Sequence, residues 1–166
     1  MKKLYIVRHA KSTWDETYVS DFERPLNKRG RRDAPMMGRV LLDLGARVDF
    51  IRSSTAVRAL TTARLLAEAM SFPLANIVAE DSMYGASASA LLHGVKKLPD
   101  SAGEAMIVAH NPGVHMLAEL LAGFPEANFP TCGIVCVELP IDRWQDSASG
   151  TGTMKFYEYP KRHSVD

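Results

Sequence analysis

The most informative stretch of this sequence is Leu4-Tyr5-Ile6-Val7-Arg8-His9-Ala10-Lys11-Ser12. Its first four residues are apolar and rich in β-forming side chains, which predicts a short strand buried on both faces. The apolar run stops at Arg8, so a guanidinium and an imidazole come directly after it. Strands buried on both faces belong to sheets that helices cover on each side. Arg8 and His9 are therefore expected at the carboxyl end of a central strand.

The rest of the chain alternates short apolar runs with helical patterns. After Asn27, apolar residues recur at helical spacing as far as Leu44. Further strands are predicted at 48–52, 77–79, 106–109, 134–139 and 154–159, with helices at 56–70 and 88–98 and a polar loop at 142–152. Strands that alternate with helices predict an α/β fold. We expect a three-layer α/β/α sandwich with a mostly parallel central sheet.

Capping residues predict where several helices begin. Asn27 is a plausible N-cap for the first helix, although Pro35 lies inside the pattern and predicts a kink or a later start. Residues 53–55 supply hydroxyl groups that could cap the second helix. Asn111 and Pro112 have the residue types of an N-cap followed by a first helical position. A helix is therefore expected to begin at Pro112.

Length and composition predict one globular domain. The chain has 166 residues, of which 46% are hydrophobic and 23% charged. Both fractions are ordinary for a soluble domain with its own core. A single domain over 1–166 leaves no residues for a separate cap or lid. The N-terminal apolar run ends at Arg8, which makes it too short for a signal-peptide core or a membrane span.

The overall charge argues against nucleic acids and membrane surfaces as partners. The formal net charge is +1, without the basic excess of a general polyanion binder. The densest local cluster is Lys28-Arg29-Gly30-Arg31-Arg32, which a solvated start of a helix also explains. This cluster therefore receives no role from the sequence alone.

The two cysteines, Cys132 and Cys136, are predicted to be free and buried. On one strand they would lie about 13 Å apart, whereas a disulfide needs Cα atoms within about 7 Å. The flanking sequence offers no second pair of metal ligands. We therefore expect neither a disulfide nor a metal, and a reducing cytoplasmic location.

Polar residues follow three of the predicted strands. They are Arg8-His9, the segment 53–58 that ends in Arg58, and His110 with Asn111. In sheets of this class, ligands bind at the carboxyl ends of the strands. Two arginines, two histidines and nearby helix N-termini suit an anion, and phosphate suits the arginine fork best. The spacing alone leaves a phosphate site and ordinary structural roles equally open.

These segments also carry a family resemblance. The opening segment, Pro25-Leu26-Asn27-Lys28-Arg29-Gly30, the segment from Ser53 to Ala63, and Val108-Ala109-His110-Asn111-Pro112-Gly113 resemble the successive motifs of the histidine phosphatase superfamily. The order and spacing agree from residue 4 to about residue 123. The short length, Ala10 after His9, and Trp14 followed by the segment 21–26 are most similar to the SixA-type phosphohistidine phosphatases. The resemblance implies a phosphoglycerate mutase-like fold.

The resemblance also implies roles for individual residues. His9 would be the nucleophile that becomes phosphorylated, Arg8 and Arg58 would bind the phosphoryl oxygens, and His110 would complete the pocket. Two arginines and a histidine can surround the transferred group without a metal or a cofactor. Ser12 matches a position near the pocket, and a hydrogen bond within the loop explains it equally well.

A general acid is harder to assign. Related mutases place a carboxylate three residues before a Tyr-Gly pair, and Asp81 has this spacing before Tyr84, with Glu80 beside it. A solvated loop carboxylate is the alternative interpretation of Asp81. An acid matters most for an alkoxide leaving group, which is very basic. If Asp81 is poorly placed, phosphoramidates should be preferred to simple phosphate esters.

The expected function is a metal-independent phosphatase that works through phospho-His9. Phosphohistidine on a protein is the favoured substrate, and a small phosphorylated metabolite or a non-catalytic phosphate-binding module are the alternatives. Trp14 either lines the entrance of the pocket or holds the loop after the first strand. The other histidines are expected to be structural or exposed: His93, His115 and His163.

Overall fold

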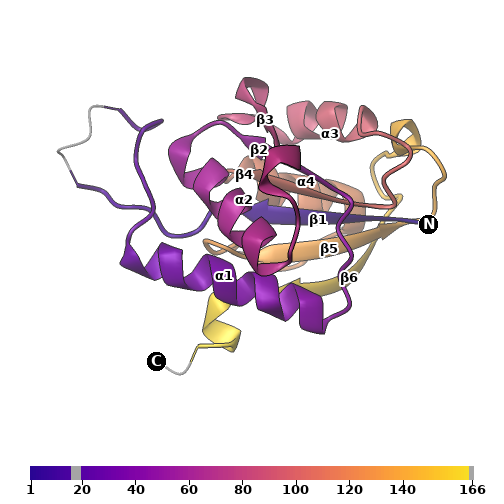
Figure 1. Ribbon diagram of the computed structural model, residues 1–166. Coiled ribbons are helices and arrows are strands. Elements are labelled where there is room, and N and C mark those ends of the chain that lie inside the picture. Colours follow the sequence, from indigo (N-terminus) through magenta and orange to yellow (C-terminus); the bar gives the residue numbers. More distant parts are fainter. Residues whose placement is uncertain (16–19, 165–166) are drawn as a thin grey trace.

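The computed structural model describes residues 1–15 and 20–164, which form a six-stranded sheet of order β3-β2-β4-β1-β5-β6 (Figure 1). The pairs β1–β4, β2–β4 and β2–β3 are parallel, whereas β5 is antiparallel to both β1 and β6. The prediction of a mostly parallel sheet is therefore confirmed. The bounds are β1 (Lys2–Arg8), β2 (Phe50–Ser54), β3 (Val78–Glu80), β4 (Glu104–Ala109), β5 (Ile134–Leu139) and β6 (Thr153–Glu158).

Helices cover both faces of the sheet. The helices are α1 (Lys28–Asp43), α2 (Val57–Ala69), α3 (Ala88–Lys96) and α4 (Gly113–Ala122). Alternate side chains of β1 enter opposite layers, as the two-residue period of a strand requires. Leu4 and Ile6 pack in the cluster that contains α3 and α4. Tyr5 and Val7 pack in the cluster that contains α1 and α2. The predicted three-layer sandwich is confirmed.

The start of α1 follows the predicted cap. The Asn27 side chain accepts a hydrogen bond from the Gly30 backbone N–H at 2.9 Å. Pro35 lies within α1, but the helix still begins at Lys28, so the expectation of a later start is wrong. Proline removes one helical hydrogen bond, and the buried Met37 and Leu41 on the same helix offset this loss by packing against the sheet.

The predicted cap of α2 is wrong. Residues 53 and 54 belong to β2, and the N-cap of α2 is Ala56, which makes no side-chain cap bond. The hydroxyl of Ser54 accepts from the Ala56 N–H at 3.2 Å and also lies 2.8 Å from Nε2 of His110. The Ser54 hydroxyl therefore contacts the backbone after β2 and a histidine of the site, and it does not cap α2.

The predicted start of α4 is also wrong. The helix begins at Gly113, and Pro112 occupies the N-cap position. Asn111 does not cap the helix, because its side-chain N–H donates to the Phe129 carbonyl at 3.0 Å. This bond ties the end of β4 to the loop before β5.

The late loops contain two further differences from the sequence predictions. Residues 142–152 include a short 3-10 turn whose Trp144 is fully buried and donates its indole N–H to the Ala102 carbonyl at 2.9 Å. Cys132 precedes β5, so it does not share a strand with Cys136. Both cysteines are free and buried, as expected. The bounds of the predicted strands 48–52 and 77–79 shift by one or two residues.

Gly30 allows α1 to pack directly on the loop after β1. A Cβ atom at Gly30 would overlap the Lys11 carbonyl oxygen, which also accepts a hydrogen bond from the Asn27 N–H at 3.0 Å. We expect Gly30→Ala to lower the free energy of unfolding by about 1–3 kcal/mol, because backbone must move. In contrast, a Cβ at Gly94 of α3 would meet its nearest atom, on Arg52, at 3.8 Å.

Gly94→Ala is therefore the matched control. It should raise the free energy of unfolding by about 0.5–1 kcal/mol, since alanine favours a helix over glycine. Urea unfolding of both variants measures the difference. A stability gain in Gly30→Ala would contradict this description of the packing.

Candidate active site

Two histidines meet at the carboxyl ends of neighbouring strands. Arg8 ends β1 and pairs in register with Ala109, which ends β4. His9 and His110 come one residue later, and the His9 N–H donates to the Ala109 carbonyl at 3.1 Å. Their ring centroids are 5.3 Å apart. Parallel strand order therefore brings together two residues that are distant in the sequence.

These histidines line a pocket of about 280 Å³. Arg58, the second residue of α2, reaches the same pocket because β2 lies beside β4. The described residues that line it carry four cationic side chains and one carboxylate, which favours an anionic ligand. They are Arg8, His9, Lys11, Ser12, Trp14, Asp21, Arg24, Arg58, His110, Asn111 and Thr131.

His9 is held as a neutral imidazole with a defined tautomer. Its Nδ1 lies 2.7 Å from the Ala10 carbonyl oxygen. A carbonyl only accepts, so Nδ1 carries the proton and Nε2 keeps its lone pair. Burial lowers the pKa of His9 to about 3, and the nearby charges of Arg58 and Arg8 act in the same direction. At neutral pH, Nε2 is thus available for nucleophilic attack.

His110 is also neutral, for similar reasons. Burial lowers its pKa to about 4, with Arg58 as the next cause. Its Nε2 lies 2.8 Å from the Ser54 hydroxyl oxygen. Its Nδ1 is buried and has no hydrogen-bond partner in the described part of the protein. When the Ser54 hydroxyl donates to Nε2, Nδ1 carries a proton that a ligand oxygen can accept.

The two arginines expected from the sequence are both anchored. Arg8 donates from Nη1 to the Phe129 carbonyl at 2.9 Å. Arg58 donates to the carbonyl and the carboxylate of Asp21, at 2.7 and 2.9 Å. The Nε atoms of Arg8 and Arg58 are buried without a partner among the described residues. A bound oxyanion would offer acceptors to such donors, since buried polar groups are rarely left unpaired.

Asp21 is a site residue that the sequence did not reveal. Its carboxylate accepts from Arg58, from Arg24 Nε at 3.0 Å and from the Tyr84 hydroxyl at 2.7 Å. These bonds, that from Tyr84 first, hold the pKa of Asp21 well below its usual range. Asp21 is therefore ionised at neutral pH, so it positions Arg58 and has no proton to give.

Arg24 joins the pocket to its rim. It is buried, and its Nη1 donates to the Ser12 hydroxyl at 2.7 Å and to the Thr13 carbonyl at 2.9 Å. Its guanidinium lies 3.6 Å from the ring centroid of Trp14, which is 74% exposed. The sequence left two roles open for Ser12 and Trp14, a place in the pocket or a contact within the loop. Each residue has both, because it lines the pocket and also contacts Arg24 in the loop. The position of Asp21 and Arg24 just before Pro25 was the available sequence signal for a role in the site. Such a spacing does not reveal which side chains these residues contact.

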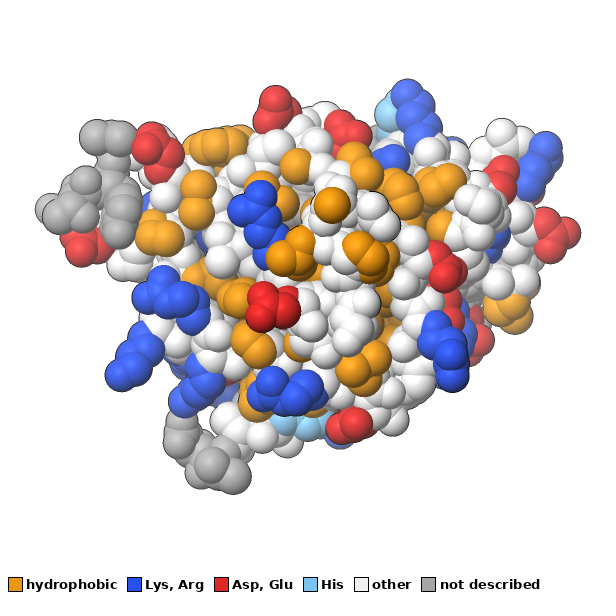
Figure 2. All heavy atoms as spheres, viewed as in Figure 1, with side chains coloured by type: hydrophobic (Ala, Val, Ile, Leu, Met, Phe, Trp, Pro, Cys, Tyr) orange, Lys and Arg blue, Asp and Glu red, His pale blue; other side chains and the backbone are white. Residues whose placement is uncertain are grey.

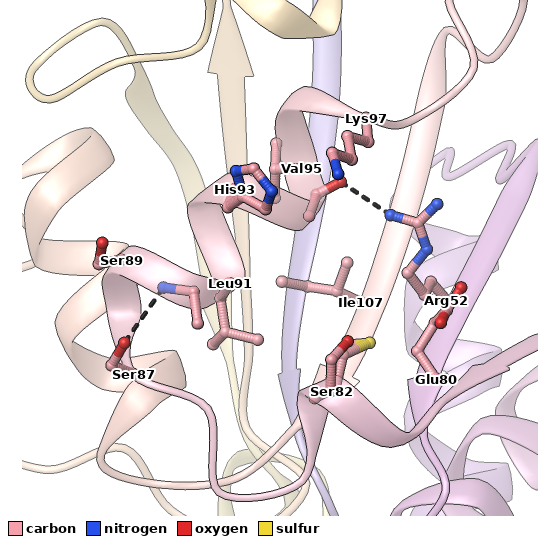
Figure 3. Close-up of a pocket in the computed structure, with 13 residues that line it drawn as sticks. Arg52, Glu80, Ser82, Ser87, Ser89, Leu91, His93, Val95, Lys97 and Ile107 are labelled. Carbon is pink, nitrogen blue, oxygen red and sulfur yellow. Dashed lines mark hydrogen bonds between the residues drawn. The ribbon is translucent and has the colours of Figure 1, made fainter.

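Asp81 lies outside this pocket. It is exposed in the turn η2 (Asp81–Met83) and accepts a hydrogen bond from the Thr55 hydroxyl at 2.5 Å. Its neighbour Glu80 lines a different pocket of about 680 Å³ between α3 and β2. In Figure 3, Glu80 lies beside Arg52 on the wall opposite α3. The structure thus brings neither carboxylate to His9, and Asp21 is the only carboxyl among the described pocket-lining residues.

The remaining histidines make contacts elsewhere. His93 is exposed on α3 and lines the second pocket (Figure 3). His115 Nε2 lies 2.9 Å from the Glu126 carbonyl oxygen, and His163 Nε2 lies 2.5 Å from a carboxylate oxygen of Glu158. Within residues 1–15 and 20–164, no group of three or more His, Cys, Asp or Glu side chains could hold a metal ion. No helix among the same residues is long and apolar enough to cross a membrane.

The fold and the pocket define a class of protein: an α/β sandwich that presents a neutral histidine and several arginines to an oxyanion. The sequence model of the histidine phosphatase superfamily (branch 1) matches residues 4–82. An uncharacterised chloroplastic protein of Arabidopsis thaliana is 30% identical, over 93% of this chain and 75% of that protein. An uncharacterised protein of Mycobacterium tuberculosis is 27% identical, over 93% of this chain and all of that one.

Solved structures agree. SixA from Agrobacterium tumefaciens, described as a candidate phosphohistidine phosphatase, has a TM-score of 0.82 and 26% identity over 96% of this chain and 98% of that one. SixA complexed with tungstate has a TM-score of 0.83 and 18% identity over 98% and 99% of the two chains. Phosphoglycerate mutase from Bacillus anthracis has a TM-score of 0.67 and 14% identity over 82% and 87%. The chain belongs to the histidine phosphatase superfamily, and it is a phosphatase with a SixA-like structure.

Proposed function

We propose that this phosphatase hydrolyses phosphohistidine on proteins, and that the phosphoryl group passes through His9. In the first step, Nε2 of His9 attacks phosphorus and the P–N bond of the substrate breaks. The phosphohistidine ring of the substrate is protonated on its other nitrogen, so the leaving imidazole keeps the electron pair of that bond and departs as a neutral molecule without a proton from the enzyme. In the second step, water attacks phospho-His9, which releases inorganic phosphate and restores the neutral imidazole.

The positive groups of the pocket would stabilise the transferred phosphoryl group. Its charge lies on three equatorial oxygens, so positioning and cationic stabilisation dominate catalysis. Arg8, Arg58 and His110 line the pocket, and each has a buried side-chain nitrogen without a partner among the described residues, which supports this role. We assign the phosphoryl oxygens to these three side chains. No step requires a metal or a cofactor.

The state of Asp21 is the single observation that carries the choice of substrate. It is the only carboxyl among the described residues of the pocket, and it is ionised and bonded to Arg58. Among the described residues, an alkoxide leaving group would therefore find no carboxylic acid beside it, and a general acid is worth about 10²–10⁴ in rate. Imidazole is a much weaker base than an alkoxide. In transfer from phosphohistidine to His9, the attacking and leaving groups are both imidazoles, so the bond that forms resembles the bond that breaks.

The size of the pocket favours a phosphorylated side chain over a small metabolite. Its volume of about 280 Å³ lies near the lower limit for sites that enclose a whole ligand, about 300–1,000 Å³. Trp14 at the rim is 74% exposed and available to contact a protein surface around the phosphoryl group. These features support a protein substrate.

A substrate panel tests this proposal. We expect kcat/KM for a phosphohistidine peptide to exceed that for a sugar phosphate by about 100-fold or more, because only the sugar ester needs an acid. p-Nitrophenyl phosphate should lie between them, since nitrophenolate leaves without a proton. Asp81→Asn should change none of the three rates. Equal rates for the sugar phosphate and the peptide would contradict the assignment.

Two outcomes would favour the alternatives. Selective loss of sugar phosphate hydrolysis in Asp81→Asn would make Asp81 the missing acid and would favour a phosphatase of small metabolites. Phosphate binding without turnover of any substrate would favour a non-catalytic module, and would also contradict the family assignment.

We also propose that residues 1–166 form a single domain without a cap insertion and that the protein works in the cytoplasm. Both cysteines are free and buried, which suits a reducing compartment. Burial raises the pKa of Cys136 to about 12, so this thiol is inert rather than reactive.

A further inference from the structure

A cluster of exposed cations lies next to the catalytic pocket. Its members come from the first five residues of α1 and from the 3-10 turn η4 (Pro160–Arg162), which contacts α1. Figure 2 shows basic side chains gathered over the N-terminal end of α1, at the lower left of the view. We name this cluster the basic track; its residues are Lys28, Arg29, Arg31, Arg32, Lys161 and Arg162, all exposed.

The basic track is continuous with the pocket. Thr131 lines the catalytic pocket and also a neighbouring hollow, which Arg29 and Lys161 line as well. Arg29 and Lys161 in turn border a larger, open hollow of about 940 Å³ together with Lys28. Lys11 also lines the catalytic pocket and is exposed, so it adds a further cation at the edge of the pocket. A protein surface whose phosphorylated side chain enters the pocket would therefore cover the track.

The cations at the start of α1 lie where positive charge is unfavourable for the helix. The N-terminus of a helix carries positive partial charge, so a cation in the first turn is unfavourable for the helix. The first turn of α1 contains no acidic residue. Asp33 pairs with two arginines of the track, at 3.6 and 3.5 Å, and Glu158 pairs with a third at 3.5 Å. In these ion pairs, two carboxylates pair with three of the six cations, so the described part of the track carries an excess of positive charge.

We propose that the basic track docks an acidic surface of the phosphorylated protein substrate. This inference rests on the proposed function, because it needs a phosphohistidine that enters the neighbouring pocket. Complementary charge would speed encounter and orient the substrate, with little effect on chemistry in the pocket. A protein suits the track better than a nucleic acid, since the chain as a whole has a net charge of only +1.

Two peptides of identical length supply the test. Each carries one phosphohistidine, flanked on both sides by three glutamates in the first peptide and by three lysines in the second. We expect kcat/KM to be about tenfold higher for the acidic peptide, a difference that corresponds to about 1.4 kcal/mol. The preference should shrink as NaCl rises from 50 to 300 mM, since salt screens exposed charges.

Charge-reversal variants test whether the basic track causes the preference for the acidic peptide. The double variant Lys28→Glu/Lys161→Glu should lose the preference for the acidic peptide and leave the rate with p-nitrophenyl phosphate unchanged. Neither lysine contributes to the catalytic pocket or to an ion pair given above. The matched control is Arg39→Glu/Arg64→Glu, which makes the same change in net charge at exposed sites on α1 and α2. This control should keep the preference.

Each result has a distinct meaning. Hydrolysis of both peptides at equal rates by the wild type would overturn the docking proposal and leave the proposed function standing. Hydrolysis of neither peptide, with p-nitrophenyl phosphate still cleaved, would overturn both. Equal loss of preference in the two double variants would show that net charge acts without a docking surface. Tighter binding of a single-stranded oligonucleotide than of the acidic peptide would replace the protein partner with a nucleic acid.

Discussion

Replacement of His9 by alanine is expected to lower kcat for p-nitrophenyl phosphate by at least about 10⁴-fold, because no nucleophile remains in the pocket. His9 Nδ1 donates to the Ala10 carbonyl, which leaves Nε2 with a free lone pair for attack on phosphorus. The histidine beside it cannot substitute, since His110 is fixed by Ser54. Initial rates of the purified variant, after its fold has been checked by circular dichroism, measure the loss.

Trapping the intermediate makes this prediction specific. Acid-labile, base-stable phosphoryl label should appear on His9 of the wild type and be missing in His9→Ala. The variant His110→Ala should still acquire the label, more slowly, because it keeps the nucleophile and loses a group that stabilises the phosphoryl oxygens. The exposed His93 on α3 supplies the control, and His93→Ala should behave as the wild type. Turnover or label that persists in His9→Ala would refute the assigned mechanism.

The core of the site was predictable because it depends on strand order. Apolar runs located β1 and β4, and the rule that parallel strand ends share one edge then placed His9 beside His110. The position of Arg58 was predictable because it lies at the start of α2, just after β2. His9, His110 and Arg58 are positioned by strands and helices that the spacing of apolar residues in the sequence predicts.

Loop residues were not predictable in the same way. Asp21 bonds to Arg58 and Tyr84, which are 37 and 63 residues away in the sequence. No periodic pattern encodes a contact between an irregular loop and a distant helix or turn. Asp81 had the spacing of a general acid, but the Thr55 hydroxyl binds it outside the pocket.

The helix caps failed for a related reason. Ser54 and Asn111 have the residue types of N-caps. In the structure, the hydroxyl of Ser54 lies against His110, and the amide of Asn111 binds the Phe129 carbonyl. Local propensity was overridden by tertiary hydrogen bonds around the pocket, which is where such conflicts concentrate in proteins.

Two buried neutral histidines also make the stability of the protein depend on pH. Folding lowers the pKa of His9 from 6.5 to about 3 and that of His110 from 6.5 to about 4. Below pH 6.5 the unfolded chain therefore binds protons that the folded protein does not, so stability falls as pH falls. Between pH 7.5 and pH 5 the loss is about 2 kcal/mol for each histidine. The total of about 4 kcal/mol is a large part of a typical stability of 5–15 kcal/mol.

Urea unfolding in phosphate-free buffers at pH 7.5, 6 and 5 measures this loss. The variants His9→Asn and His110→Asn should each remove about half of it, and the double variant should be nearly independent of pH over this range. The ionised Asp21 does not disturb the measurement, because its lowered pKa makes its own contribution fall away only at more acidic pH. A wild-type stability that stays constant from pH 7.5 to pH 5 would mean that folding does not lower the pKa values of His9 and His110. His9 would then be protonated below about pH 6.5, as a free histidine is, and would lose the lone pair that the mechanism needs at those pH values.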